Sequence, residues 1–191
     1  MRAIMSLTAA LTLSACLAAC STDDDQPTIL APPSPSPAVS SADSSASTEV
    51  NPPVMPPEAE AQTADGAMAF VRHYFAVVDY AYSTGDTAPL AKVSDPECGP
   101  CTGIKEMVDE AFASSQSFER GPTAISGTPA VEIQPEGWAE VTVTYSTPPL
   151  RRISDTGTIT LAFAEVIDAR LLVFIVPAPS GWSMRSVHET A

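Results

Sequence analysis

The composition of residues 20–61 most constrains the fold of this chain, because it predicts that the folded domain begins only after residue 61. The stretch consists mainly of Pro, Ser, Ala, Thr and acidic residues, with three aspartates at 23–25 and four prolines within 32–37. It has too little apolar surface to offset the entropy lost on folding, so we expect a disordered tether with polyproline II character. Residues 62–191 remain, and they suffice for one domain of ordinary size.

An apolar leader precedes the tether. Residues 1–19 carry one charge, Arg2, and then an apolar run that ends in small residues, which is the layout of an export signal. The run is too short for a comfortable transmembrane helix. Leu17-Ala18-Ala19-Cys20 resembles the lipobox of bacterial lipoproteins, and this resemblance implies that Cys20 becomes the lipidated first residue of the mature protein.

Two alternatives to lipidation at Cys20 arise from the same residues. Leu13-Ser14-Ala15-Cys16 fits the lipobox pattern as well, so Cys16 competes with Cys20. We favour Cys20, because use of Cys16 would leave a very short signal and an odd thiol in an oxidising compartment. The other alternative is a simple secretory signal in which the cysteine is coincidental.

The charge of the chain narrows the choice of partners. A formal net charge of −14, without any long basic cluster, argues against nucleic acid and anionic lipid as partners. We expect an extracytoplasmic protein held on the cell membrane by a lipid at Cys20, with an envelope protein or a small ligand as its partner.

Apolar residues recur at helical spacing in the first half of residues 62–191. The spacing predicts a long first helix that Thr63 caps and Gly85 ends. A short second helix is expected after Asp86-Thr87, and Asp95-Pro96 signals the start of a third. The first half is therefore predicted to be helical.

The second half changes to a period of two. Residues 138–145 alternate between apolar and polar, which indicates a strand with one face in solvent. Residues 169–176 are apolar on both faces, so we expect them at the centre of a sheet. Shorter strands are expected at 130–133, 159–163 and 182–187. Three helices followed by about four antiparallel strands predict an α+β domain.

This order of elements resembles the NTF2-like (cystatin-like) fold, a cone in which N-terminal helices pack on a curved antiparallel sheet. At finer grain, the chain looks like an uncharacterised family of actinobacterial lipoproteins. That second resemblance rests on Phe70-Val71-Arg72 with Tyr74-Phe75, the stretch 80–87, Ser94-Asp95-Pro96 with the two later cysteines, and Gly181-Trp182. It implies the same layout of signal, tether and domain, and it implies no activity.

Cys98-Gly99-Pro100-Cys101 has the four residues of the thioredoxin active site. A thiol at a helix start is made acidic by the helix dipole, which is the basis of dithiol chemistry. Here the preceding residues look helical, whereas thioredoxin has a buried strand, and Asp95 and Glu97 oppose a thiolate. We favour a structural disulfide between Cys98 and Cys101. The alternatives are a redox pair, with Cys98 as nucleophile and Cys101 as resolving thiol, and a metal site, for which two cysteines are too few.

Few other side chains suggest chemistry. His73 and His188 are expected on solvent faces, and Arg151-Arg152 in a solvated loop between strands. We expect no catalytic residue, no metal and no cofactor. The candidate binding residues inside the cone are Tyr74, Tyr82, Tyr145 and Asp168.

These observations support three function hypotheses. The leading one is a membrane-anchored envelope lipoprotein whose domain binds a protein or small ligand through its concave sheet, without catalysis. The alternative is an extracytoplasmic thiol–disulfide oxidoreductase that uses Cys98 and Cys101. A third is a small-molecule enzyme that works inside the cone.

Overall fold

The computed structural model describes residues 50–190. The export signal, Cys16, Cys20 and most of the predicted tether lie outside these residues. None of the helices within 50–190 is both long and apolar enough to cross a membrane.

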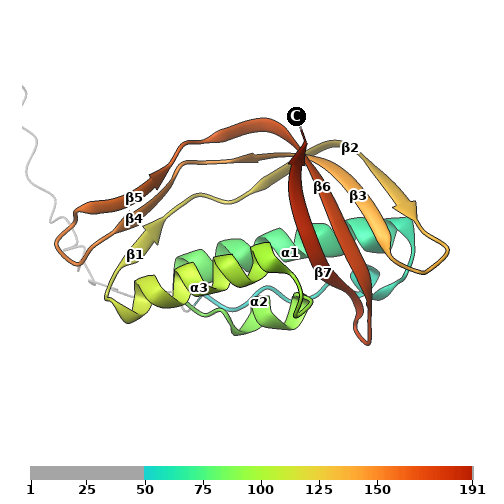
Figure 1. The fold of residues 1–191 in the computed structure, drawn as a ribbon, viewed down its shortest axis with the longest axis horizontal. Helices are drawn as coiled ribbons and strands as arrows, with labels where there is room; N and C mark the ends of the chain where they lie inside the picture. The colour runs from blue at the N-terminus through green and yellow to red at the C-terminus, as the bar shows by residue number, and fades with distance from the viewer. Residues whose placement is uncertain (1–49, 191) are drawn as a thin grey trace, which may run out of the picture. The chain divides into compact units, whose positions relative to one another are not determined.

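Helices form the N-terminal half of the described chain (Figure 1). They are a 3-10 helix η1 (Pro57–Glu60) and the α-helices α1 (Ala64–Thr84), α2 (Ala88–Val93) and α3 (Gly99–Ala113). The predicted ends of α1 are confirmed: the hydroxyl of Thr63 accepts a hydrogen bond from Gly66 N at 3.2 Å, and Gly85 has φ 79°.

The third helix begins later than the Asp95-Pro96 signal suggests. The carboxylate of Asp95 accepts a hydrogen bond from Glu97 N at 2.8 Å, which forms a turn instead of a helix start. Cys98 is the N-cap of α3, and its sulfur accepts a hydrogen bond from Cys101 N at 3.3 Å. The cysteine motif itself therefore opens the helix.

Seven strands within 50–190 form two antiparallel sheets. The larger sheet has the order β2 (Ala124–Ile133), β3 (Ala139–Thr147), β6 (Val166–Ala178), β7 (Gly181–Thr190), and the smaller has the order β1 (Ser117–Glu119), β4 (Leu150–Ile153), β5 (Ile159–Phe163). The expectation of about four strands matches the larger sheet but misses β1 and β4. Arg151 and Arg152, expected in a loop, lie in β4, where they pair with β1 and β5.

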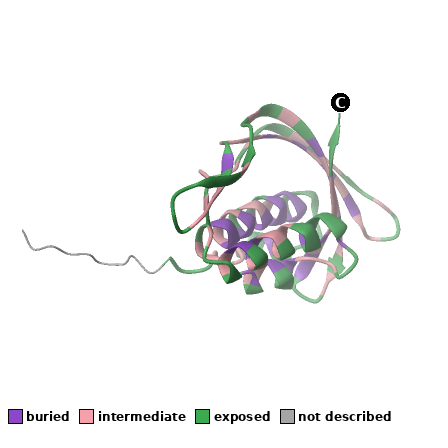
Figure 2. Cartoon of the chain, turned by 60° about the vertical axis from the view of Figure 1, so that its left-hand side comes forward, coloured by how far each residue is buried: buried purple, intermediate pink, exposed green. Residues whose placement is uncertain are grey.

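The core lies between the larger sheet and the helices, where the buried residues of both, purple in Figure 2, face one another. As expected, β6 is an inner strand of the sheet, between β3 and β7. Alternate residues of β3 and β6 are buried and meet apolar side chains of α1. On the strands these residues are Val141, Val143, Leu171, Val173 and Ile175.

The packed region begins before residue 62, so the predicted tether extends too far at its C-terminal end. Ala59 of η1 is fully buried, and the indole N–H of Trp182 donates to the carbonyl oxygen of Ala61 at 2.9 Å. Gly181, with φ 104°, lies so close that an added Cβ would be 2.6 Å from the Cα of Glu60. Only glycine fits at this contact.

Candidate functional site

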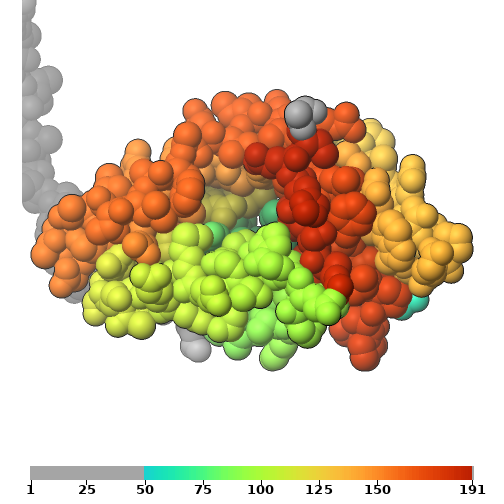
Figure 3. All heavy atoms as spheres, viewed as in Figure 1, coloured from blue at the N-terminus to red at the C-terminus, as the bar shows by residue number. Residues whose placement is uncertain are grey.

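The domain is hollowed between α3, β7 and the strands above them, as the space-filling view in Figure 3 shows. The face of the larger sheet that looks toward the helices is set by register. Tyr145 of β3 pairs with Ala169 of β6, and Leu171 of β6 pairs with Glu189 of β7. These four residues therefore share one face, which we call the concave face.

Tyr145 and Glu189 meet across β6 on the concave face. Ala169 carries only a methyl group, which leaves room for the Tyr145 ring to cross the strand. The Tyr145 hydroxyl donates a hydrogen bond to Oε1 of Glu189. Burial raises the pKa of Tyr145 to about 12, and the hydrogen bond to Glu189 and the charge of Glu189 add to the effect. At neutral pH Tyr145 therefore keeps its proton, and its hydroxyl holds the Glu189 carboxylate in place through the hydrogen bond.

A second polar group surrounds Arg120, which follows β1. The Arg120 guanidinium lies 3.3 Å from the Asp79 carboxylate and donates to the hydroxyl of Thr123 at 2.6 Å. It covers the ring of Tyr82 at 5.0 Å from the ring centroid, within cation–π range. Within residues 50–190, the buried Nε of Arg120 has no hydrogen-bond partner.

The charge of Arg120 reaches both candidate tyrosines. Burial raises the pKa of Tyr82, and the nearby cation of Arg120 opposes this shift. The same cation lowers the pKa of Tyr145, against the larger effect of burial. The charge of Arg120 thus acts on both Tyr82 and Tyr145, and the three residues form one polar region.

The other two candidates lie elsewhere. Tyr74 is only 1% exposed, and its hydroxyl donates to the sulfur of Cys101 at 3.3 Å, so it belongs to the core. Burial raises its pKa well above the usual value. Asp168 is exposed beside an irregularity in the β3–β6 pairing, and its backbone N–H donates to the hydroxyl of Ser146. The prediction that all four residues gather in the cone is therefore wrong for these two.

Sequence reasoning missed three residues of the site. Asp79 and Arg120 are 41 positions apart and form their ion pair only in the fold. Glu189 lies just beyond the strand predicted at 182–187, because β7 continues to Thr190. The sequence does hold one signal for Glu189: the period of two, extended past Val187, places Glu189 on the same face as Val187.

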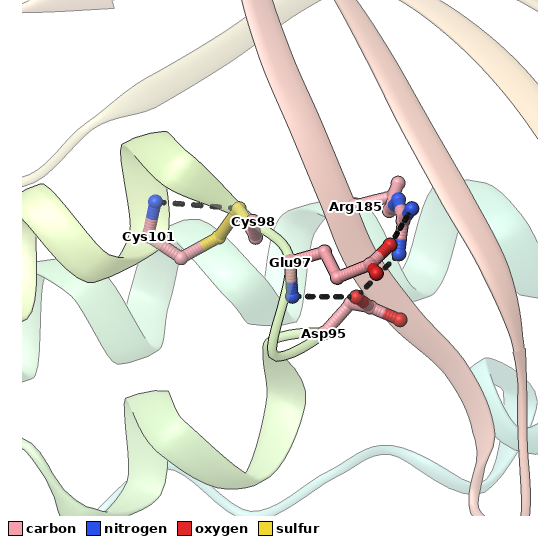
Figure 4. A network of polar contacts seen from close by, with 5 residues as sticks. All are labelled: Asp95, Glu97, Cys98, Cys101 and Arg185. Carbon is pink, nitrogen blue, oxygen red and sulfur yellow. Dashed lines mark hydrogen bonds and ion pairs between the residues drawn. A yellow bond between two sulfur atoms is a disulfide. The ribbon is translucent and has the colours of Figure 1, made fainter.

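The cysteine pair is joined as a disulfide at the start of α3, with 5.3 Å between the Cα atoms (Figure 4). Cys98 is 0% exposed and Cys101 is 3% exposed. Catalytic dithiols need an accessible sulfur in an electropositive environment. This burial therefore favours a structural disulfide.

The charges beside the disulfide point the same way. Asp95 and Glu97 both pair with Arg185 of β7, Asp95 at 2.7 Å (Figure 4). The backbone hydrogen bond from Glu97 and the bond from Arg185 lower the pKa of Asp95, so this carboxylate remains charged near Cys98. Two carboxylates with one shared cation do not favour a thiolate.

Three surface predictions have different outcomes. His73 is 7% exposed, so its predicted solvent position is wrong, and burial lowers its pKa. His188 is exposed as expected, with its ring edge-to-face against Phe174 at 5.9 Å. Arg152 lies 4.0 Å from the Glu110 carboxylate and is an ordered part of β4.

Within 50–190, no three His, Cys, Asp or Glu residues are grouped to hold a metal ion.

More than half of the chain matches a known protein family. Residues 39–157 match DUF6318, which is described as a family of unknown function. No curated protein sequence matches the chain.

Several solved structures resemble the chain at low sequence identity. The intermembrane space region of the chloroplast protein ARC6 is 12% identical, with a TM-score of 0.51 over 68% of this chain and 97% of that one. ActVI-ORFA from Streptomyces coelicolor is 15% identical, with a TM-score of 0.41 over 65% and 96%. An uncharacterised protein with a cystatin-like fold from Caulobacter vibrioides is 16% identical, with a TM-score of 0.36 over 66% and 87%. The first likeness supports a shared α+β fold.

Proposed function

This chain belongs to DUF6318, a family of unknown function, and we propose that it is a membrane-anchored envelope lipoprotein that binds a small ligand on its concave face without catalysis. The observation that carries the binding role is the Tyr145–Glu189 pair, which presents a held carboxylate on the concave face. Its NTF2-like (cystatin-like) architecture is part of the same proposal.

The anchor is proposed from the lipobox-like residues 17–20. A diacylglyceryl group on Cys20 would supply two acyl chains at about 0.8 kcal/mol per buried methylene, enough for stable attachment where one chain is marginal. As a flexible coil, the tether predicted from the sequence, about 40 residues, would average roughly 35 Å from end to end. The domain would then work at a distance from the membrane surface.

Replacing Cys20 by serine is expected to abolish lipidation. The Cys20→Ser protein should lose its acyl mass and leave the washed membrane fraction, because serine has no thiol to receive the diacylglyceryl group. Mass spectrometry of the mature N-terminus and fractionation of the cells measure both effects. Cys16→Ser is the matched control and should stay lipidated. The reverse pattern would assign the anchor to Cys16, and lipid on neither cysteine would refute the anchor.

The concave face suits a ligand with an apolar body and a hydrogen-bond-donating group. Tyr145 occupies Oε1 of Glu189, and among the contacts within residues 50–190 Oε2 is left for an incoming donor. Glu189 is exposed, and the neighbouring Ala169 and Val187 are only partly buried, which leaves apolar surface beside the carboxylate. Because Asp79 already pairs with Arg120, the unbalanced charge here is that of Glu189. A protonated amine complements that charge.

The proposed site predicts a preference between two probes of similar size. Phenethylamine should bind more tightly than 3-phenylpropionate, and Glu189→Gln should weaken the amine by about tenfold, the cost of one charge-assisted hydrogen bond. NMR titration of the full-length protein measures both affinities. Glu140→Gln on the opposite face of the sheet is the matched control and should change neither. Equal loss in both variants, or no binding of the amine at millimolar concentration, would refute this site.

A further inference from the structure

A separate groove of about 900 Å³ lies between the extended segment 53–56, α1 and β2. Its volume falls within the range of small-molecule sites in proteins. None of the concave-face residues named above lines it. The apolar part of the lining includes Pro53, Val54, Pro56, Met68, Ala69 and Val131.

The charged residues of this groove are separated along α1. Asp65 lies in the first turn, and the backbone of Glu58 is close to it, with the Glu58 carbonyl oxygen 2.8 Å from where a Cβ on Gly66 would lie. Arg72 follows seven residues after Asp65, so it lies on the same helix face at a rise of about 10 Å. The helix dipole supplies about half a positive charge near Asp65, and two carboxylates exceed it. One end of the groove is therefore negative, and the other end is positive.

His73 adds a polar group near the positive end. Its side chain lines the groove and is 7% exposed. Burial lowers its pKa, so at neutral pH the ring is uncharged and offers one donor and one acceptor. The ring therefore offers a hydrogen-bond partner to a ligand in the groove.

We infer that this groove binds a short apolar peptide with free termini, about three residues long. An extended chain rises about 3.3 Å per residue, so a tripeptide spans about 10 Å, which matches the rise of α1 from Asp65 to Arg72. Its amino terminus lies at Glu58 and Asp65, its carboxylate pairs with Arg72, and a backbone amide bonds to His73. Its side chains contact the apolar walls. The groove is a second site, independent of the concave face.

The tripeptide Leu-Ala-Leu tests this inference by calorimetric titration of the full-length protein. The N-acetylated form and the C-amidated form should each bind about tenfold more weakly than the free peptide, because each has lost one charge-assisted contact. Equal binding of the three forms, or no binding of the free peptide at millimolar concentration, would overturn the inference.

Two variants locate the peptide and fix its direction. Arg72→Gln should weaken the free peptide to the level of its amide and leave the amide unchanged, since both changes remove the same contact. The matched control is Arg170→Gln, an exposed arginine on β6, which should have no effect. A loss of binding in Glu189→Gln would move the peptide to the concave face, and equal losses in the two arginine variants would refute a specific pairing. Either result overturns the groove assignment.

Discussion

Replacement of Trp182 by alanine is expected to lower the free energy of unfolding by about 3–5 kcal/mol. Trp182 is 1% exposed and is among the largest fully buried side chains of the domain. Its removal leaves a cavity in the core and deprives the carbonyl oxygen of Ala61 of its 2.9 Å hydrogen bond. Ala61 and Trp182 are 121 positions apart, so this contact joins the start of the packed region to its last strand.

The second tryptophan of the chain provides the control. Trp138 is half-buried and stacks beside Phe174 at 5.7 Å between ring centroids. Trp138→Ala should cost about 1 kcal/mol, the usual effect of a change outside the core. Urea denaturation of both variants measures the difference. Trp182→Phe removes the hydrogen bond, worth about 1 kcal/mol, and only part of the buried ring, so its loss should lie between those of the two alanine variants. If the two alanine variants lost equal stability, the packing of η1 on β7 would not be an important contact.

The long first helix is predictable because its determinants are local. The cap at Thr63, the stop at Gly85 and the spacing of apolar residues between them all act within a few residues. The long strands of the larger sheet are predictable for the same reason, since alternation within one strand marks its buried face.

The smaller sheet depends on contacts that are distant in sequence. β1 has only three residues, too few to show an alternation of apolar and polar side chains. β4 contains two arginines, which are more typical of a solvated loop than of a strand. Glu119 of β1 pairs with Arg151 of β4 in the register, and their side chains approach to 3.9 Å. β4 is a strand because it pairs with its neighbour in the sheet, and the sequence of β4 alone does not predict this.

The candidate site is predictable only in part, for a related reason. Tyr145 stands out as an aromatic on the inward face of a strand, but its partner Glu189 lies 44 positions away and faces it only through the register of three strands. The sequence suggests a solvent face for His73 because only one side of the first helix is expected to be covered. Residues 53–58 pass along a further side of α1, and His73 lines the groove between them. An extended segment of prolines gives no periodic signal for such a contact.

Removal of the disulfide is expected to cost the domain about 2 kcal/mol. A four-residue loop releases little chain entropy, which sets this value at the low end for disulfides. Its removal also disturbs buried contacts, because the sulfur of Cys98 caps α3 and that of Cys101 accepts the Tyr74 hydroxyl. Thermal denaturation with and without dithiothreitol should show a fall in melting temperature on reduction. The Cys98→Ala/Cys101→Ala double variant should melt at the lower temperature under both conditions.

The same samples decide between a structural and a catalytic role for the pair. Because both cysteines are buried and Asp95 and Glu97 oppose a thiolate, we expect a reduction potential below about −300 mV, as for structural disulfides. A potential between about −270 and −120 mV, with a reduced form at least as stable as the oxidised one, is the behaviour of catalytic dithiols. That result would replace the proposed binding role with that of an oxidoreductase in which Cys98 is the nucleophile. A disulfide that destabilises its own protein readily passes its oxidising equivalents to a substrate thiol.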